Sequence, residues 1–380
     1  MNNNQIPLFD LDYGIEEEEA VIKVLKSKWL TMGEETERFE EEFAKYIGVK
    51  YATAVSNCTV ALHLANLAVG VLPGDEVICP SLSFVATSNS ILYARGIPVF
   101  ADVSSMDDWT ISPEDIEKKI TKKTKAIMVM HYAGFSCNMD AIMKIASENN
   151  LKVIEDAAHS PGSLYKKKQL GSIGDISCFS FFSNKNISTG EGGMICTNND
   201  DYAKKIKLWR SHGMTSSTLD RHKGHSFSYD VIEKGYNYRI DEIHSALGRV
   251  QLRKLKENNQ KRFHAAEYYK KILSSIEEVK IPFEEYKHLP NYHIFPILLN
   301  KDIDRNGFMK FLSESGIQSS IHYRPVHTFS YYKQMMALQS LPLTEEIGQR
   351  EVTLPMYPSI SEEQIDRVVK AIKDCLRNKH

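Results

Sequence analysis

The sequence predicts an α/β protein with a large domain built on a three-layer, mainly parallel sheet and a smaller α+β domain at the C-terminus. From about residue 50 to residue 250, short segments rich in Val, Ile and aromatic residues alternate with longer segments of helical periodicity. The short segments are mostly apolar along their length, which is typical of strands covered on both faces. Such strands, connected by helices, form parallel sheets between two helical layers. One long helical segment without proline then leads into a smaller, more mixed C-terminal part.

Two helices are expected before the sheet, at residues 16–29 and 35–47. Apolar residues in both recur at intervals of three and four, and acidic residues at their starts suit the positive end of a helix dipole. The strands of the sheet are expected at residues 51–55, 75–80, 97–103, 125–132, 151–156, 175–182 and 193–197. Helices between them are expected at residues 59–69, 84–96, 112–120 and 139–150.

The segment 241–273 is expected to form a helix that connects the two domains, which we place at residues 1–250 and 251–380. In the C-terminal part, a strand is expected at 292–299. Two further helices are expected, at 307–316, closed by Gly316, and at 361–376, opened by Ser361. Glycine commonly ends helices, and a serine hydroxyl caps their first amides.

The composition excludes several classes of protein. Of the 380 residues, 42% are hydrophobic and 25% are charged, which is ordinary for a globular protein. The formal net charge of -2 provides no broad basic field for nucleic acid or for an anionic membrane. No stretch of about 18 apolar residues is present, and the first residues lack the pattern of a signal peptide. We therefore expect a cytoplasmic protein that contacts neither nucleic acid nor membrane.

The cysteines and histidines do not form the pattern of a disulfide framework or a metal site. The six cysteines are scattered and form no CxxC pair, so buried, reduced thiols are expected. His222 and His225 lie close together, but no acidic or cysteine residues follow them at the spacing of zinc ligands. We expect no metal.

The residues with the most reactive chemistry lie between 151 and 193. Asp156 ends an apolar strand, at the edge where ligands bind in open α/β sheets. Lys185 follows another apolar strand, in a segment of Ser, Asn, Thr and Gly that a ligand can approach closely. Taken singly, the two residues fit a helix cap and a solvated loop lysine better than a reactive site.

A phosphate-binding pattern changes this interpretation. Residues Ser56 to Thr59 follow a strand and open a helix, where free backbone amides and hydroxyls bind phosphate. Ser180 adds a hydroxyl near Lys185. A carboxylate for a pyridinium nitrogen, a lysine for a Schiff base and a helix start for a phosphate are the parts that pyridoxal 5′-phosphate (PLP) requires. We therefore predict PLP as the cofactor.

The chain resembles the DegT/DnrJ/EryC1/StrS family of PLP-dependent nucleotide-sugar aminotransferases, which have the fold type I, aspartate aminotransferase-like architecture. The resemblance extends almost from end to end, through the segments SKWLTMGEETERFEEEFAKYIG, SNCTVALHLA, LPGDEVICPSLSFVATSNSI, VIEDAAHSPGS, FSFFSNKNISTGEGGM, GYNYRIDEIHSALGRVQL and GIQSSIHYRPVHT. The segment around Lys185 is the most specific, because a dehydratase branch of the family has His at that position.

The resemblance implies roles for individual residues. Lys185 resembles the catalytic lysine that forms the Schiff base and then moves a proton, and Asp156 resembles the aspartate that binds the pyridine nitrogen. The other residues that the resemblance and the phosphate-binding pattern assign to the cofactor are Asn57, Cys58, Thr59, Phe84, His159 and Ser180, with Asn237 of a second subunit. An ordinary core Phe84 and a packing role for His159 are the alternatives. The family more often has Gly where this chain has Cys58, which leaves the geometry of that turn open.

On the substrate side, the resemblance points to Trp29, Thr31, Tyr132, Arg221, Arg239, Arg324 and His327. Arginine suits a carboxylate or a diphosphate, although a surface ion pair explains any single one of them at least as well. Because Asn237 would reach the cofactor of the other subunit, a homodimer is expected.

The reaction implied by the resemblance is the transfer of an amino group from L-glutamate to a keto-deoxysugar on UDP, GDP or dTDP, through pyridoxamine phosphate (PMP). The HYAG segment at 131–134 favours amination at C4, with a product for lipopolysaccharide or a related glycan or antibiotic pathway. A 3-keto sugar or a cyclitol is the alternative substrate. A non-catalytic regulatory paralogue and a dehydratase are both disfavoured by the presence of Lys185.

Overall fold

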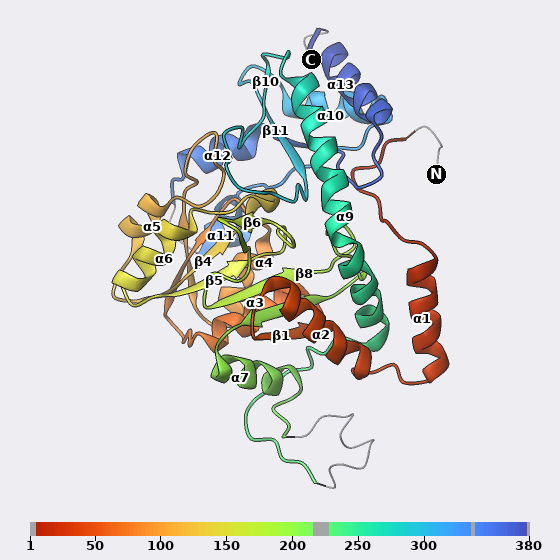
Figure 1. The fold of residues 1–380 in the computed structure, drawn as a ribbon. Coiled ribbons are helices and arrows are strands. Elements are labelled where there is room, and N and C mark those ends of the chain that lie inside the picture. The colour runs from red at the N-terminus through yellow and green to blue at the C-terminus, as the bar shows by residue number, and fades with distance from the viewer. Residues whose placement is uncertain (1–4, 216–227, 336–338, 378–380) are drawn as a thin grey trace.

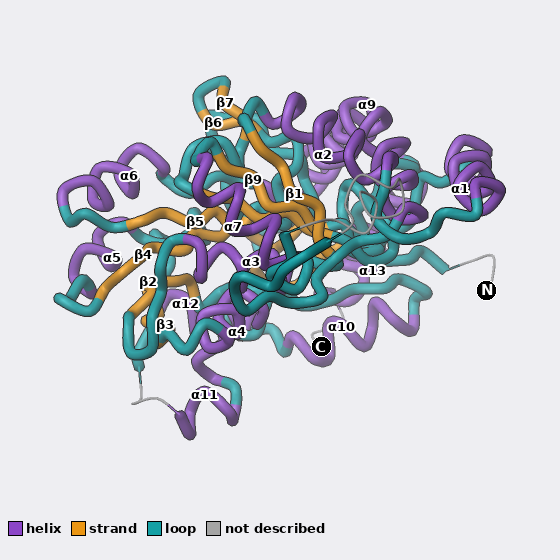
Figure 2. The backbone as a smooth tube through the Cα atoms, turned by 90° about the horizontal axis from the view of Figure 1, so that it is seen from below, coloured by secondary structure: helices purple, strands orange, loops and turns teal. Residues whose placement is uncertain are grey.

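The centre of the protein is a seven-stranded sheet with the strand order β1-β9-β8-β5-β4-β2-β3 (Figures 1 and 2). The computed structural model describes residues 5–215, 228–335 and 339–377. The strands of this sheet are β1 Tyr51–Val55, β2 Glu76–Pro80, β3 Ile97–Ala101, β4 Thr124–Met130, β5 Lys152–Asp156, β8 Ile176–Ser180 and β9 Gly193–Thr197. Strand β9 is antiparallel to both of its neighbours, and every other neighbouring pair is parallel. The predicted mainly parallel sheet is confirmed.

Helices cover both faces of this sheet. Val77 and Cys79 of β2 belong to one buried cluster, whereas Ile78 between them belongs to another. Because successive side chains of a strand point to opposite faces, both faces are buried, as the apolar strands predicted. The helices on the two faces are α3 Cys58–Ala68, α4 Val85–Tyr93 and α7 Asp200–Arg210 on one, and α2 Glu34–Ile47, α5 Pro113–Lys119 and α6 Met139–Glu148 on the other.

The C-terminal part contains a second, antiparallel sheet, in the order β10-β11-β12. Its elements are β10 Val279–Lys280, β11 Phe295–Leu299, β12 Glu351–Leu354, α10 Arg305–Glu314, α11 Ser330–Met335, α12 Pro342–Arg350, α13 Glu362–Arg377 and the 3-10 turn η2 Val326–Thr328. Gly316, with a φ of 78°, follows α10, and Ser361 Oγ accepts the Gln364 amide at 3.2 Å before α13. Both predicted helix ends are confirmed.

Three short elements complete the sheet domain. They are the 3-10 turn η1 Tyr132–Gly134 and the two-stranded ribbon β6 Leu164–Tyr165 and β7 Lys168–Gln169. The ribbon, rather than a helix, links β5 to its parallel neighbour β8.

Helix α9, Glu242–Leu273, runs from the large sheet to the small one (Figure 1). Its 32 residues span about 48 Å. Leu252 and Leu255 pack in the core of the large sheet, and Tyr269 and Leu273 pack in the core of the small sheet. The helix crosses residue 250 without a break. The division into two domains at that residue therefore stays a prediction.

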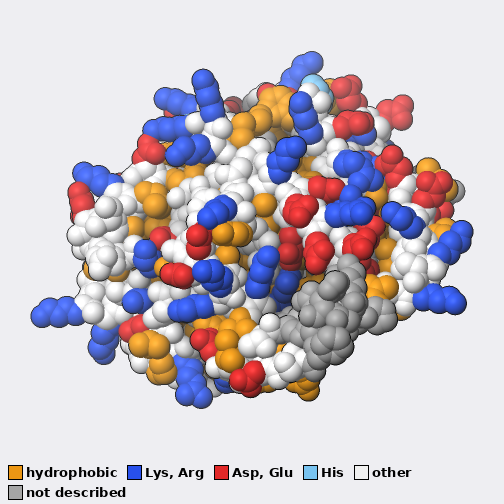
Figure 3. Space-filling model, turned by 60° about the horizontal axis from the view of Figure 1, so that its bottom comes forward, with side chains coloured by type: hydrophobic (Ala, Val, Ile, Leu, Met, Phe, Trp, Pro, Cys, Tyr) orange, Lys and Arg blue, Asp and Glu red, His pale blue; other side chains and the backbone are white. Residues whose placement is uncertain are grey.

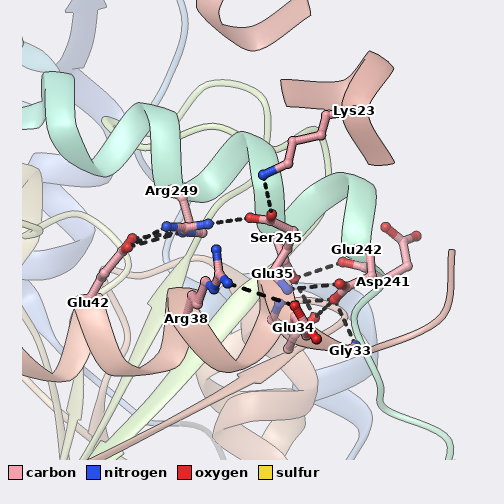
Figure 4. A network of polar contacts seen from close by, with 11 residues as sticks. Lys23, Gly33, Glu34, Glu35, Arg38, Glu42, Asp241, Glu242, Ser245 and Arg249 are labelled. Atoms are coloured by element: carbon pink, nitrogen blue, oxygen red, sulfur yellow. Dashed lines mark hydrogen bonds and ion pairs between the residues drawn. The ribbon is translucent and has the colours of Figure 1, made fainter. Parts of the chain in front are cut away.

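Helices α1, Ile15–Ser27, and α2 lie beside the first half of α9 and are tied to it by a polar network (Figure 4). The buried carboxylate of Glu242 accepts hydrogen bonds from the amides of Gly33 at 2.7 Å and Thr36 at 3.0 Å. Arg249 pairs with Glu42 at 2.6 Å and also with Glu35. A carboxylate at the start of α2 satisfies amides that the helix itself cannot. The network fixes the segment before α2 next to the start of α9.

The surface and the cysteines agree with the composition. Figure 3 shows basic and acidic side chains interspersed over one face of the molecule. All six cysteines are buried free thiols, as predicted. Within the described ranges, no helix is long and apolar enough to cross a bilayer.

Candidate active site

A cavity of about 450 Å³ lies at the carboxyl ends of β4, β5 and β8. Met130, Asp156 and Ser180, the last residues of these strands, form part of its wall. Eight predicted cofactor residues line it together: Asn57, Cys58, Thr59, Phe84, Asp156, His159, Ser180 and Lys185. Parallel strands bring their carboxyl ends to one edge of the sheet, so residues far apart in the sequence meet there.

Asp156 is a buried carboxylate held by neutral donors. Its Oδ2 accepts a hydrogen bond from Thr87 Oγ1 at 2.7 Å, and its Oδ1 accepts one from the Ala158 amide at 3.2 Å. Burial raises the pKa of Asp156, and the two donors and the charge of Lys185 oppose that rise. Such a carboxylate can pair with a protonated nitrogen that a ligand presents from the cavity.

Lys185 reaches the same cavity from the turn that follows β8. Its amide donates to the Phe182 carbonyl at 2.9 Å, which closes the turn, and its Nζ lies 3.2 Å from Nε2 of His293. Burial lowers the pKa of Lys185 to about 8, although the nearby Asp156 acts in the opposite direction. More of this amine is unprotonated at neutral pH than for a solvated lysine, as a nucleophile requires.

The start of α3 forms a third wall. Asn57 is its N-cap: the side chain accepts the Val60 amide at 3.0 Å, and the carbonyl accepts the Ala61 amide. These two hydrogen bonds use the amides of Val60 and Ala61. The preceding amides, of Cys58 and Thr59, are left for a ligand. Asn57 has extended backbone angles, and Cys58 simply begins the helix. The turn therefore does not require glycine at the Cys58 position.

Strand β9 supports this helix start at very close range. A Cβ added to Gly193 would lie 2.6 Å from the carbonyl carbon of Asn57 and 2.8 Å from the amide nitrogen of Cys58. Both are backbone atoms, so no side chain fits between β9 and α3. Glycine at this position lets the anion-binding end of α3 lie close to the sheet.

Aromatic side chains enclose the remaining side of the cavity. The ring of Phe84 is 58% exposed and lies 6.2 Å from that of Tyr323. The Tyr323 hydroxyl lies 2.8 Å from Nε2 of His159, whose Nδ1 lies 3.3 Å from the Ala133 amide. Burial lowers the pKa of His159, so the ring is neutral at physiological pH. An exposed phenylalanine at a cavity mouth offers a flat apolar face to a planar ligand.

The model of the DegT/DnrJ/EryC1/StrS aminotransferase family matches residues 12–373. The chain belongs to this family. GDP-perosamine synthase of Escherichia coli is 38% identical over 375 residues, which cover 98% of this chain and 99% of the relative. The structure of Helicobacter pylori PseC, an aminotransferase involved in the biosynthesis of pseudoaminic acid, is 31% identical, has a TM-score of 0.93, and matches 98% of this chain and 100% of its own.

A further solved structure shows the cofactor class. The Streptococcus pneumoniae protein Spr1654 in its PMP form is 26% identical with a TM-score of 0.93, over 99% of this chain and 100% of its own, and it is also known in a PLP form. The chain is thus an enzyme of the PLP-dependent sugar aminotransferase class. The predicted family, fold and cofactor are confirmed.

The cavity of this aminotransferase suits the polar groups of PLP. Asp156 offers a carboxylate for the ring nitrogen, and Lys185 offers an amine for the aldehyde. The start of α3 offers amides for the phosphate, and Ser180 adds a hydroxyl to the same cavity. The donor set therefore fits the cofactor that the family uses.

The position of Tyr132 in the structure differs from its prediction as a substrate contact. The side chain is fully buried, packs against Trp109 and Phe283, and donates a hydrogen bond to the carbonyl of His322. Desolvation keeps the phenol protonated by raising its pKa well above 10. Tyr132 supports the cavity wall from behind and does not line the cavity.

Arg324 and His327 also lie outside the cavity lining. Arg324 Nε donates to Thr328 Oγ1 at 3.2 Å, and its guanidinium lies 5.1 Å from the centre of the Phe329 ring. His327 Nδ1 lies 2.7 Å from Ser81 Oγ, and its Nε2 lies 3.3 Å from Glu345. Within one subunit these two side chains therefore contact protein groups outside the cavity lining.

Of the other predicted substrate residues, Trp29, Thr31 and Arg239 lie near the start of α9, as does Asn237, the predicted cofactor ligand of a second subunit. Thr31 forms a β-bridge with Asp241, and the exposed Asn237 forms one with Ser211. Trp29, Thr31, Asn237 and Arg239 are not part of the lining of their own subunit's cavity. Arg221, His222 and His225 lie outside the described residues. In the part of the chain that the structure describes, no three His, Cys, Asp or Glu side chains could hold a metal ion.

Several residues of the site are absent from the sequence prediction. Thr87, which binds Asp156, lies one helical turn after Phe84, and that spacing is a usable signal. His322 and Tyr323 directly precede the predicted Arg324 and line the cavity in its place. His293 lies in a segment with the pattern of a strand start, and only the tertiary structure brings it to Lys185.

Proposed function

We propose that this aminotransferase transfers the amino group of L-glutamate to a nucleotide-linked keto-deoxysugar, most favourably a 4-keto sugar on UDP, GDP or dTDP. The observation that carries the proposal is the meeting of Lys185, Asp156 and the start of α3 in one cavity. The name of the GDP-perosamine synthase, which is similar along its whole length, supports a sugar on a nucleoside diphosphate. The product would be an amino sugar for lipopolysaccharide or another surface polysaccharide.

Each residue of the cavity then has a task. Bound PLP supplies a ring that withdraws electrons from the carbon bearing the amine. Asp156 would keep a proton on the ring nitrogen, and Lys185 would move a proton to and from the reacting carbon. Phe84 would cover one face of the ring and exclude water. The amides of Cys58 and Thr59, with Ser180, would hold the phosphate.

A second subunit would complete the site. Asn237 is exposed and does not line its own cavity, so it is free in space to enter the cavity of a partner. We propose that Trp29, Thr31 and Arg239, which lie in the same region of the surface, also face the cavity of the partner. The active form would be a cytoplasmic homodimer with its two sites at the subunit interface. Sedimentation of the purified protein tests this, since a fully active monomer would exclude a phosphate ligand from the partner.

An absorbance spectrum tests the donor half of the reaction. The protein with PLP should show a visible band that moves to the shorter wavelength of the pyridoxamine form when L-glutamate is added. Lys185→Ala should abolish that movement. A band that glutamate leaves unchanged would contradict the proposed donor, and the absence of any band would contradict the assignment of Lys185.

The acceptor is found by screening the glutamate-treated protein. UDP-, GDP- and dTDP-linked 4-keto-6-deoxysugars are offered separately, and the amino sugar is detected by mass spectrometry. Turnover of a 3-keto sugar, or of a free cyclitol ketone without nucleotide, would favour those alternatives. Failure of every acceptor despite a working donor half would contradict a nucleotide-linked keto sugar as the acceptor.

A further inference from the structure

The amino group of Lys185 has a polar neighbour behind the cavity wall. Nε2 of His293 lies 3.2 Å from Lys185 Nζ, and His293 is only 3% exposed. His293 stands just before β11, in the C-terminal part of the chain, whereas Lys185 follows β8 of the large sheet. The contact therefore joins the reactive lysine to a different part of the fold.

The hydrogen bonds around Asn186 determine which nitrogen of His293 carries the proton. The Asn186 side-chain nitrogen donates to the Asn291 carbonyl at 3.3 Å, and a carbonyl can only accept. The side-chain oxygen of Asn186 is therefore the atom 3.0 Å from Nδ1 of His293, and this oxygen also only accepts. Nδ1 must carry the hydrogen. The Nε2 of a neutral His293 then presents its lone pair to Lys185.

The surroundings keep His293 neutral. Burial and the charge of Lys185 lower its pKa well below the usual range. The ionisable groups that face this pair are His159, His322 and Arg262 around His293, and Asp156 and Cys58 around Lys185. The positive charges of Lys185 and Arg262 oppose a second proton on His293, whereas Asp156 favours the ammonium form of Lys185. A charged donor thus meets a neutral acceptor, which is a strong kind of hydrogen bond.

We propose that His293 is a positioning residue for Lys185, whose free amine it holds at the cavity wall by accepting a hydrogen bond at Nε2. This inference rests on the proposed function of Lys185 and adds a residue that the sequence prediction does not contain. When the amine is released from the cofactor, His293 holds it in one position and keeps its pKa within a narrow range. Asn186 acts through His293 by fixing its tautomer.

A pair of substitutions separates the acceptor from the packing. In His293→Gln, the amide oxygen can replace Nε2 as the acceptor for Lys185. In His293→Asn, the shorter amide can replace Nδ1 toward Asn186 but does not reach Lys185. The experiment uses the cofactor-free full-length protein, with PLP as the probe. The rate at which the visible band forms is followed against pH, and Lys185→Ala gives the background.

We expect wild type and His293→Gln to share the same pH midpoint. The midpoint of His293→Asn should fall by about one pH unit, because the ammonium form of Lys185 loses an acceptor. An unchanged midpoint in His293→Asn would overturn the inference. Equal shifts in both variants would also overturn it, since they would indicate a packing effect.

A second variant serves if His293→Asn does not fold. Asn186→Ala removes the acceptor that fixes the tautomer without adding charge, and its midpoint should fall in the same direction by a smaller amount. No shift would again overturn the inference. Different outcomes test the function of Lys185 and the role of His293. If Lys185→Ala still forms the band, the proposed function fails, whereas a lost band with no shift in His293→Asn removes only the role of His293.

Discussion

Thr87 Oγ1 donates a hydrogen bond of 2.7 Å to Oδ2 of Asp156, and Ser83 Oγ lies 2.6 Å from the same hydroxyl. The carboxylate in the cavity is thus hydrogen-bonded to Thr87 in the first turn of α4, and Thr87 contacts Ser83 just before that helix. Asp156 sits where burial favours its neutral form, and Thr87 is the strongest of the groups that favour the charged form. The state of the carboxylate therefore depends on a residue that does not line the cavity.

Replacing Thr87 by Val should weaken the enzyme through Asp156. The valine keeps the shape of threonine but removes the donor, so the pKa of Asp156 rises further. We expect turnover at neutral pH to fall about tenfold, for a lost hydrogen bond to a charged group. The acid limb of the pH profile should move to higher pH. Thr87→Ser keeps the hydroxyl and is the matched control, and a Val variant with the wild-type profile would refute the role of Thr87.

Replacing Asp156 by Asn should separate activity from stability. Loss of the carboxylate should lower turnover at least about 100-fold, because the charge that holds the ring proton is gone. The folded pKa of Asp156 is raised, so the ionised group opposes folding at any pH above its unfolded pKa. The cofactor-free variant should therefore melt no lower than the wild type. Kinetics and calorimetry measure the two effects, and a parallel loss of both would indicate that Asp156 is chiefly structural.

The parts of the site that lie at strand ends and helix starts follow from the sequence. Asp156 ends one apolar strand and Lys185 follows another, and parallel pairing of β5 with β8 is enough to bring them to one edge. Asn57 follows the same logic, because a polar residue between a strand and a helix is a cap. Local pattern and one topological rule therefore predict these residues.

The rest of the site depends on contacts that no local pattern contains. His293 and Tyr323 come from the C-terminal part, more than 100 residues after Lys185 in the sequence. Only in the folded chain does His293 contact Lys185 and Tyr323 contact His159. Tyr132 illustrates the opposite error. The HYAG segment lies at the end of β4, as a cavity residue should, but the 3-10 turn directs the tyrosine into the core. Side-chain direction after a strand end is set by the turn and is not visible in the sequence.

Replacing Gly193 by Ala should weaken PLP binding without touching the cofactor. The added Cβ meets the Asn57–Cys58 peptide at 2.6 to 2.8 Å, so the start of α3 must shift. Overpacking of this kind costs about 1–3 kcal/mol, and we expect the Kd for PLP to rise about tenfold or more. Titration of the cofactor-free protein with PLP measures this. Gly14→Ala is the control, because nothing lies within 4 Å of its added Cβ. Equal affinities for both variants would exclude the proposed contact.

Replacing Glu351 by Gln should change how stability depends on pH. Glu351 is fully buried, its Oε2 accepts the His322 amide at 2.7 Å, and desolvation raises its pKa from 4.5 to about 7. Between these two values the folded protein holds a proton that the unfolded chain releases. The wild type should therefore lose up to about 1.4 kcal/mol of unfolding free energy per pH unit as the pH rises through this window.

Glutamine can still accept the His322 amide but does not titrate, so the variant should lack this slope and should exceed the wild type in stability above pH 7. Urea unfolding of the cofactor-free protein across the window from 4.5 to 7 measures the difference between the two proteins. The exposed Glu284→Gln is the control and should give a curve parallel to the wild type. Parallel curves for Glu351→Gln and wild type would mean that Glu351 stays ionised in the fold. That result would place its negative charge beside the His322 segment of the cavity wall at all working pH values.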